Sequence, residues 1–144
     1  MAYTIDKVDV WAGSIEDRPG SLAERLAALA GAGANLEFVI ARRDSEQPGR
    51  SVVFLAPLTG AKQRAAATKA GLSKAANLFS LRLAGPDKAG LGAKITGALG
   101  AAGINMRGIS AAALGKNSVV YFAFDEAADQ AKARGVLKKA LAGK

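Results

Sequence analysis

The stretch DRPGSLAERLAALAGAGANL at residues 17–36 contains the pattern that decides the fold, and the chain carries this pattern twice. Residues 87–106 read DKAGLGAKITGALGAAGINM, with Asp, Gly, Gly and Asn in the same register. A second match pairs SVVFLA at 51–56 with SVVYFA at 118–123. Because a duplicated unit places two similar sites in one molecule, we look for function in what the copies share.

The spacing of apolar residues predicts the same element order, β-α-β-β-α, in both copies. In the first copy we expect a strand ending near Ile15, a helix from Pro19 or Gly20 to Gly31, strands over 36–42 and 51–58, and a helix over 61–70. In the second copy we expect a strand over 78–83, a helix ending near Gly103, strands over 105–113 and 118–124, and a helix over 127–141. A ferredoxin-like unit is β-α-β-β-α-β, so each copy lacks its last strand.

The extended segment before the first turn is long enough to supply two strands. We expect residues 3–7 to complete the second copy and residues 8–13 to begin the first. The strand over 78–83 is another source of a final strand for the first copy. The predicted fold class is therefore α+β: two ferredoxin-like units with antiparallel sheets, helices on one face, and strands shared or exchanged between the units.

The composition removes several classes of function. The 144 residues include no His and no Cys, which excludes disulfides, Ser-His and Cys-His nucleophilic pairs and the commonest metal ligands. No apolar run is long enough to span a bilayer and the N-terminus lacks a signal-peptide pattern, so we expect a cytoplasmic protein with no cofactor and no metal. The net charge of +8 indicates either a solvated basic face or attraction for an anionic ligand, an acidic partner or nucleic acid.

The doubled turn, apolar helix and Gly-any-Asn exit resembles the ACT family, whose members are small ferredoxin-like modules that sense amino acids. The resemblance covers nearly the whole chain and implies a stand-alone tandem ACT protein, with one module over 1–74 and a second over 75–144. It implies an allosteric, regulatory protein that is not an enzyme and that binds a small amino acid or related carboxylate where two modules meet. Open sheet edges make a homodimer the expected assembly.

In the ACT family, the loop backbone and the Asn side chain hold the carboxylate and ammonium groups of an amino acid. Carried over by the resemblance, the expected ligand-binding residues are Asp17, Arg18, Pro19, Gly20, Ser21 and Asn35 in the first copy and Asp87, Lys88, Gly90, Leu91 and Asn105 in the second. A helix N-terminus suits a carboxylate, and Gly lets a ligand approach the backbone. The second loop has Ala and Leu where the first has Pro and Ser, so the first is predicted to be the better-formed site.

Structural roles stay open for the same residues. Asp17 and Asp87 are also suited to capping a helix, and Ser21 is spaced for a capping box with Glu24. The two Asn residues suit the left-handed conformation that often follows a helix. Trp11, the only Trp, is expected in the core.

Three other functions stay open. A regulatory or scaffold subunit would bind a partner enzyme or transporter without a small ligand, and Arg42, Arg43 and Arg50 form either a solvated hairpin or a docking site for an acidic partner. RNA-recognition modules share the ferredoxin-like layout, but the strands near 51–56 and 119–124 lack the basic and aromatic alternation that RNA requires, so nucleic acid is not the expected partner. An enzyme using carboxylates or Lys is the third alternative, although no recognisable constellation supports it.

Overall fold

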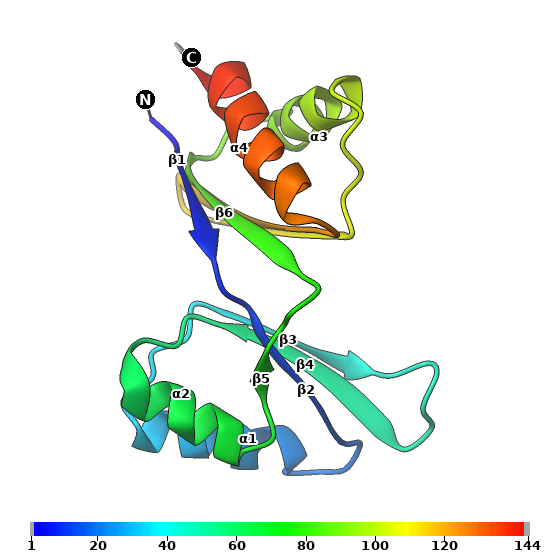
Figure 1. Ribbon diagram of the computed structural model, residues 1–144. Coiled ribbons are helices and arrows are strands. Elements are labelled where there is room, and N and C mark those ends of the chain that lie inside the picture. Colours follow the sequence, from blue (N-terminus) through cyan, green and yellow to red (C-terminus); the bar gives the residue numbers. More distant parts are fainter. Residues whose placement is uncertain (1, 143–144) are drawn as a thin grey trace. The chain divides into compact units, whose positions relative to one another are not determined.

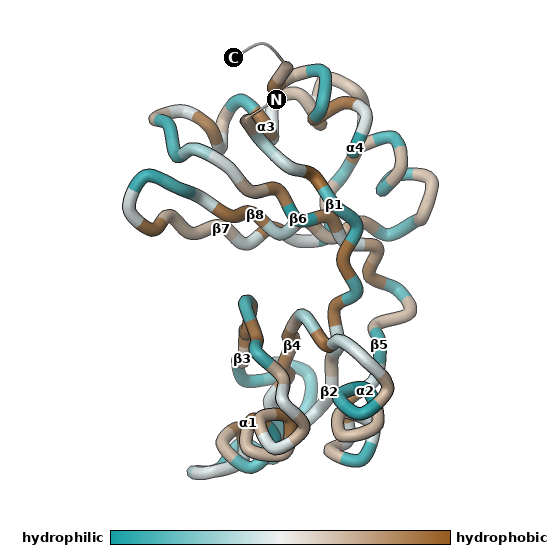
Figure 2. The backbone as a smooth tube through the Cα atoms, turned by 90° about the vertical axis from the view of Figure 1, so that its left-hand side faces the viewer, coloured by the Kyte–Doolittle hydropathy of each residue, from teal (hydrophilic) through white to brown (hydrophobic). Residues whose placement is uncertain are grey.

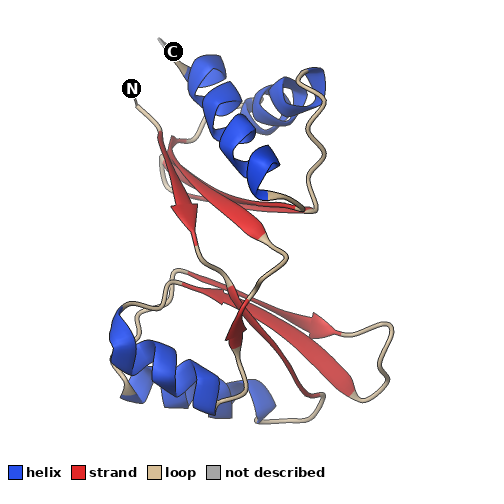
Figure 3. Cartoon of the chain, in the orientation of Figure 1, coloured by secondary structure: helices blue, strands red, loops and turns tan. Residues whose placement is uncertain are grey.

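A computed structural model describes residues 2–142 of the chain, which form two compact units. Module 1 consists of residues 9–75, and module 2 consists of residues 2–8 together with residues 76–142. Each module has two helices on one face of a four-stranded antiparallel sheet (Figures 1 and 3). The predicted fold class, α+β with two ferredoxin-like modules, is confirmed.

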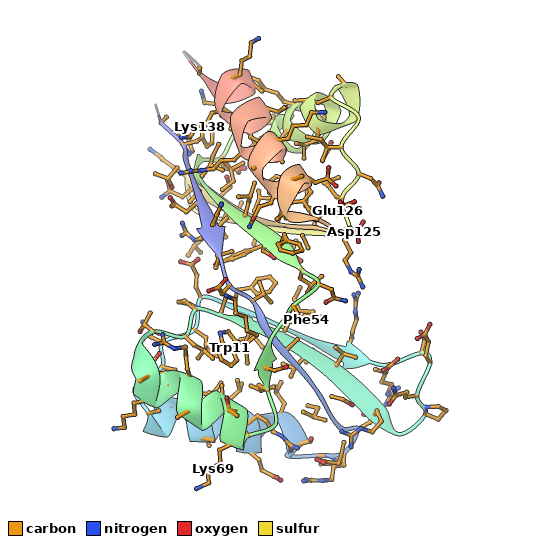
Figure 4. All side chains as sticks on the ribbon, viewed as in Figure 1. Trp11, Phe54, Lys69, Asp125, Glu126 and Lys138 are labelled. Atoms are coloured by element: carbon orange, nitrogen blue, oxygen red, sulfur yellow. The ribbon has the colours of Figure 1, made fainter. Side chains whose placement is uncertain are left out.

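Module 1 has the sheet order β3-β4-β2-β5. Its elements are β2 (Trp11–Glu16), α1 (Ser21–Gly31), β3 (Phe38–Arg43), β4 (Arg50–Ala56), α2 (Gly60–Lys69) and β5 (Ser73–Lys74). The core lies between the helices and the two central strands, where Leu29 of α1 packs with Val53 and Leu55 of β4. Trp11, which is labelled in Figure 4, is buried in this cluster, so its predicted core position is confirmed.

Module 2 has the sheet order β1-β6-β8-β7, which repeats the order of module 1 with β1 in the position of β5. Its elements are β1 (Thr4–Val8), β6 (Phe79–Pro86), α3 (Leu91–Ala101), β7 (Gly108–Leu114), β8 (Asn117–Phe124) and α4 (Ala127–Leu141). Leu81 of β6, Phe122 of β8 and Leu137 of α4 are buried together. Figure 2 shows hydrophobic stretches along β6 and β8, as expected for the central strands of a covered sheet.

The N-terminal strand completes the sheet of module 2, which confirms the predicted exchange. β1 pairs antiparallel with β6, with Ile5 opposite Leu83. Tyr3, just before β1, is buried, and its hydroxyl donates a hydrogen bond of 2.8 Å to the Pro86 carbonyl. Residues 2–8 therefore belong to the compact unit of module 2, although they precede module 1 in the sequence.

The final strand of module 1 is β5, a two-residue strand that pairs with β2. The alternative that the strand over 78–83 completes the first copy is wrong, because β6 pairs with β8 along its whole length. Leu81 and Leu83 of β6 are buried in the core of module 2, so this strand belongs to the second sheet.

Helix α4 is fixed to the sheet by one buried polar side chain. Gln130 is 8% exposed, and its Nε2 donates a hydrogen bond of 2.8 Å to the Ser80 carbonyl of β6. Glu126 lies at the start of the helix and Lys138 lies in its last turn (Figure 4). This distribution of charge is favourable for the helix dipole.

Candidate functional site

The two predicted loops share one backbone conformation at the start of a helix. Residues 17–20 join β2 to α1, and residues 87–90 join β6 to α3. Gly20 and Gly90, the last residue of each loop, have left-handed φ angles of 84° and 85°. A residue with a Cβ is strained there by about 1–2 kcal/mol, so the geometry favours glycine at both positions.

Each loop is tied to the hairpin of its own module by an equivalent backbone hydrogen bond. The Asp17 N–H donates to the Gly49 carbonyl at 3.0 Å, and the Asp87 N–H donates to the Lys116 carbonyl at 2.8 Å. Because the loops are held in the same way, the two aspartates start from equivalent backbone positions.

The first helical turn after each loop presents backbone donors that have no protein acceptor. Among residues 2–142, no acceptor is present for the N–H groups of Leu22 and Ala23 in α1, or of Gly92 and Ala93 in α3. These donors carry the positive end of the helix dipole. Both loops therefore have the backbone chemistry that binds a carboxylate.

The alternative capping roles of the loop residues are wrong. Neither Asp17 nor Asp87 caps its helix, and Ser21 forms no capping box with Glu24. Glu24 instead accepts hydrogen bonds of 2.8 and 3.0 Å from the guanidinium of Arg18. A charged donor makes a stronger bond than a neutral N–H, which explains why the carboxylate turns away from the backbone.

The base of the first loop is filled by polar side chains that bind one another. Arg25 donates to both carboxylate oxygens of Glu16, at 3.0 and 3.3 Å, and Ser21 Oγ donates to the same carboxylate at 3.3 Å. The hydrogen bonds from Arg25, with smaller contributions from the backbone of Glu16 and from Ser21, lower the pKa of Glu16 to about 2. The carboxylate is therefore ionised, and its acceptors are occupied within the module.

An ion pair also crosses from the edge strand β3 to the first loop. Arg43 Nε donates to Asp17 Oδ2 at 2.8 Å, and we call this pair the latch of module 1. Arg50, at the start of β4, lies 3.7 Å from Glu16. Two of the three arginines around the hairpin therefore contact carboxylates of their own module.

Module 2 contains a cavity of about 250 Å³ between the first turn of α3 and the edge strand β7. Four residues of the predicted site line it, namely Asp87, Lys88, Gly90 and Leu91. Ile109 and Ala113 of β7 form the facing wall. Within residues 2–142, the side chains of Asp87 and Lys88 form no hydrogen bond or ion pair, so both charges are available to a ligand.

A second cavity of about 270 Å³ borders the same loop of module 2. It shares Lys88, Gly90 and Leu91 with the first cavity and adds Tyr3 and Lys94, with Leu141 of α4. Its charged lining is cationic only, whereas the cavity beside β7 has a carboxylate and an ammonium group.

Asn35 and Asn105 lie in the connections that follow α1 and α3, and both are exposed. The left-handed conformation in these connections falls on Gly33 and Gly103, with φ angles of 85° and 74°, and on neither Asn. The alternative that the Asn residues serve this conformation is therefore wrong. Each Asn is separated from the loop of its own module by an 11-residue helix, which is about 16 Å long.

The sequence did not predict the wall of the cavity that β7 provides. Ile109, Ala111 and Ala113 lie on an edge strand and carry no functional group. The signal that could have revealed this wall is the repeat itself, because position 113 matches position 43 and has Ala in place of Arg.

Two kinds of site are absent from the part of the chain that the structure describes. No helix among residues 2–142 is long and apolar enough to cross a membrane. No group of three or more His, Cys, Asp or Glu side chains in that range is placed to hold a metal ion.

The chain shares its fold of two ferredoxin-like modules with several solved structures. A protein from Bacteroides thetaiotaomicron superposes on this chain with a TM-score of 0.78 and 18% sequence identity, and the match covers 94% of this chain and 89% of that one. The regulatory subunit of aspartate kinase from Thermus thermophilus, in its ligand-free form, has a TM-score of 0.67 and 18% identity, over 98% and 97%. The corresponding subunit from Thermus flavus has a TM-score of 0.61 and 20% identity, over 97% of each chain.

No protein-family model and no curated protein matches the sequence. The likeness to the solved structures therefore establishes a shared fold, and at this level the resemblance to ACT modules is confirmed.

Proposed function

We propose that this chain is a non-catalytic regulatory protein that binds a small amino acid or a related carboxylate at its glycine loops. The observation that carries the proposal is the second loop, where Asp87 and Lys88 line a cavity beside a helix N-terminus and have no side-chain partner among the described residues. This arrangement combines an acceptor for an ammonium group with donors for a carboxylate, which are the two charges of an amino acid.

Each group of the loop has a defined part in this proposal. The backbone N–H groups of the first helical turn receive the ligand carboxylate, because they have no acceptor among residues 2–142. The Asp side chain at the start of the loop accepts the ligand ammonium group. Gly20 and Gly90 let the ligand approach the backbone without a Cβ in the way.

The proposed site is completed by a second ACT module. A loop and the Asn of its own module lie at opposite ends of one helix, so one module cannot bring both to a small ligand. We propose that Asn35 and Asn105 contribute to sites whose loops come from another module, and that the chain is a homodimer. β3 and β7 are edge strands of their sheets within residues 2–142, and an edge strand can pair with another chain, which supports association.

The regulatory role is supported by the fold that this chain shares with regulatory subunits of aspartate kinase. Ligand binding at a contact between modules would stiffen that contact, and a partner enzyme or transporter would respond to the changed population. The absence of His and Cys from the sequence supports a role without catalysis.

A second candidate function is supported by the latch of module 1. Asp17 already binds Arg43, and Glu16 already binds Arg25, so the charged groups around the first loop are satisfied without a ligand. A regulatory subunit that binds a partner enzyme and no metabolite is compatible with this loop. The test that separates the two functions is co-purification of a partner in the presence and absence of amino acids.

The proposed function is tested by a thermal-shift screen of ligand-free protein against the twenty amino acids. Because a ligand that binds only the folded state stabilises it, the melting temperature should rise with at least one of them. At a ligand concentration 100 times the Kd, the stabilisation is about 2.7 kcal/mol. No shift with any of the twenty at millimolar concentration would contradict amino-acid binding and leave the partner-binding function.

A further inference from the structure

We infer that the two loops are not equivalent: the cavity of module 2 holds the ligand, and that ligand is an amino acid with a small aliphatic side chain. The inference rests on the proposed amino-acid-binding function and adds to it the site and the class of ligand. It reverses the ranking predicted from the loop residues alone, which placed the better-formed site in module 1.

The first step compares matched positions of the two edge strands. In module 1, the side chain of Arg43 reaches from β3 to the carboxylate of Asp17, at 2.8 Å. In module 2, the matched residues are Ala113 and Asp87, and both line the cavity beside β7. A methyl group at position 113 cannot reach the loop, so among the described residues Asp87 has no counterpart of the Arg43 ion pair.

The second step compares the residues below the loops. Arg25, whose side chain is 17% exposed, binds Glu16 and Ser21 in module 1. The positions that match Arg25 and Ser21 are Ile95 and Leu91, and both line the cavity. A cluster of polar side chains in module 1 is therefore replaced by an aliphatic lining in module 2.

The third step uses the chemistry of the walls. Apart from Asp87, Lys88 and Ser118, the side chains on the cavity are aliphatic or absent, as in Leu91, Ile109 and the glycines. Once Asp87 and Lys88 bind the ammonium and carboxylate groups of the ligand, the aliphatic lining offers no partner to a charged ligand side chain. An aliphatic side chain would gain from burial by about 0.8 kcal/mol for each CH₂ group.

The volume of the cavity is sufficient for a small amino acid. A cavity of about 150 Å³ is sufficient for benzene, whereas drug-sized ligands occupy pockets of about 300–1,000 Å³. The cavity of about 250 Å³ in module 2 lies between these limits. This volume is sufficient for valine, isoleucine or leucine, and the open side of the cavity sets no upper limit on the ligand.

The charges select this cavity over its neighbour on the same loop. A zwitterion needs an acceptor and a donor, and Asp87 and Lys88 supply both beside β7. The neighbouring cavity has Lys88 and Lys94 and no carboxylate, so it offers nothing to the ammonium group.

The test is isothermal titration calorimetry of the full chain with L-valine and L-isoleucine, and with L-aspartate and L-lysine as charged comparisons. We expect one aliphatic amino acid per chain, bound at least tenfold more tightly than either charged one. Ala113→Arg, which copies the latch into module 2, should weaken binding about fivefold, because the new guanidinium would compete with the ligand for Asp87 as an exposed ion pair. Leu114→Arg adds the same charge at a neighbouring position that is 87% exposed and should change the Kd less than twofold.

Each other result overturns the inference in a distinguishable way. Tighter binding of a charged amino acid, or full binding by folded Ala113→Arg, would refute the site or the class and leave amino-acid binding intact. Binding of none of the four, together with a negative screen of all twenty, would remove the proposed function as well. If Ala113→Arg does not fold, the affinity of Asp87→Asn is measured instead, because this change removes the negative charge and keeps the size of the side chain. Unchanged affinity in Asp87→Asn would overturn the inference.

Discussion

Replacing Gly85 by Ala would place a methyl group against the ring of Tyr3, and this clash tests the exchange of the N-terminal strand. A Cβ built on Gly85 lies 2.9 Å from both Cγ and Cε1 of Tyr3, which is closer than side-chain atoms normally approach. Tyr3 is 3% exposed and its hydroxyl is bound to the Pro86 carbonyl, so the ring cannot easily move aside. Overpacking of this kind destabilises a protein by about 1–3 kcal/mol.

The clash is isolated by a double-mutant cycle read by urea unfolding and circular dichroism. Gly85→Ala alone should lower the free energy of unfolding by about 1–3 kcal/mol. In the Tyr3→Ala background the ring is absent, and Ala is a better strand residue than Gly, so the same change should cost less than about 0.5 kcal/mol. Equal destabilisation in the two backgrounds would refute the packing of residue 3 on β6 and, with it, the exchange.

Three further predictions concern stability and charge. Gly97→Ala in α3, where a Cβ meets nothing within 4 Å, should raise the free energy of unfolding by about 0.5–1 kcal/mol in urea; destabilisation would contradict the open surface described for α3. Gln130→Ala should lower it by about 1–3 kcal/mol, because the Ser80 carbonyl loses a buried donor; an unchanged midpoint would contradict that bond. The pKa of Glu16 should be near 2 by NMR titration, and Arg25→Gln should raise this pKa. Because the pKa is lowered in the folded state, the contribution of Glu16 to stability is complete above about pH 4.5 and is lost as the pH falls to about 2.

Most elements of the fold could be predicted because their signals are local and occur twice. The last helix was predicted over 127–141 and is observed as Ala127–Leu141. Strand β8 was predicted over 118–124 and is observed as Asn117–Phe124. The continuous apolar runs of the strands and the helical spacing of apolar residues reflect which side chains are buried, and both copies bury the same faces.

The short strand β5 could not be predicted from its own residues. Ser73 and Lys74 are exposed and have no strand pattern, and they pair only because β2 offers an open edge. By contrast, the division of the N-terminal segment was predictable, because β-favouring residues extend over more positions than one strand needs. Strand β5 depends on tertiary pairing, whereas the division of the N-terminal segment follows from local composition.

The candidate site shows where reasoning from a motif is incomplete. The two loop glycines were predicted, but their left-handed φ angles, which only Gly adopts readily, are a finding of the structure. The capping roles of the two aspartates failed because Gly20 and Gly90 are the N-cap residues, so Asp17 and Asp87 lie three positions too early to cap their helices. The cavity of module 2 depends on a side chain that is missing at Ala113, which a search for functional residues does not detect.

The most direct test of amino-acid binding at the second loop is an NMR titration of uniformly ¹⁵N-labelled full-length protein with L-isoleucine. The account predicts saturable shifts of backbone amides in the second loop and the facing strand, near Gly90, Gly92 and Ala113, with the amides around Gly20 unchanged. Shifts centred on Gly20, or no saturable shift at millimolar isoleucine, would contradict it.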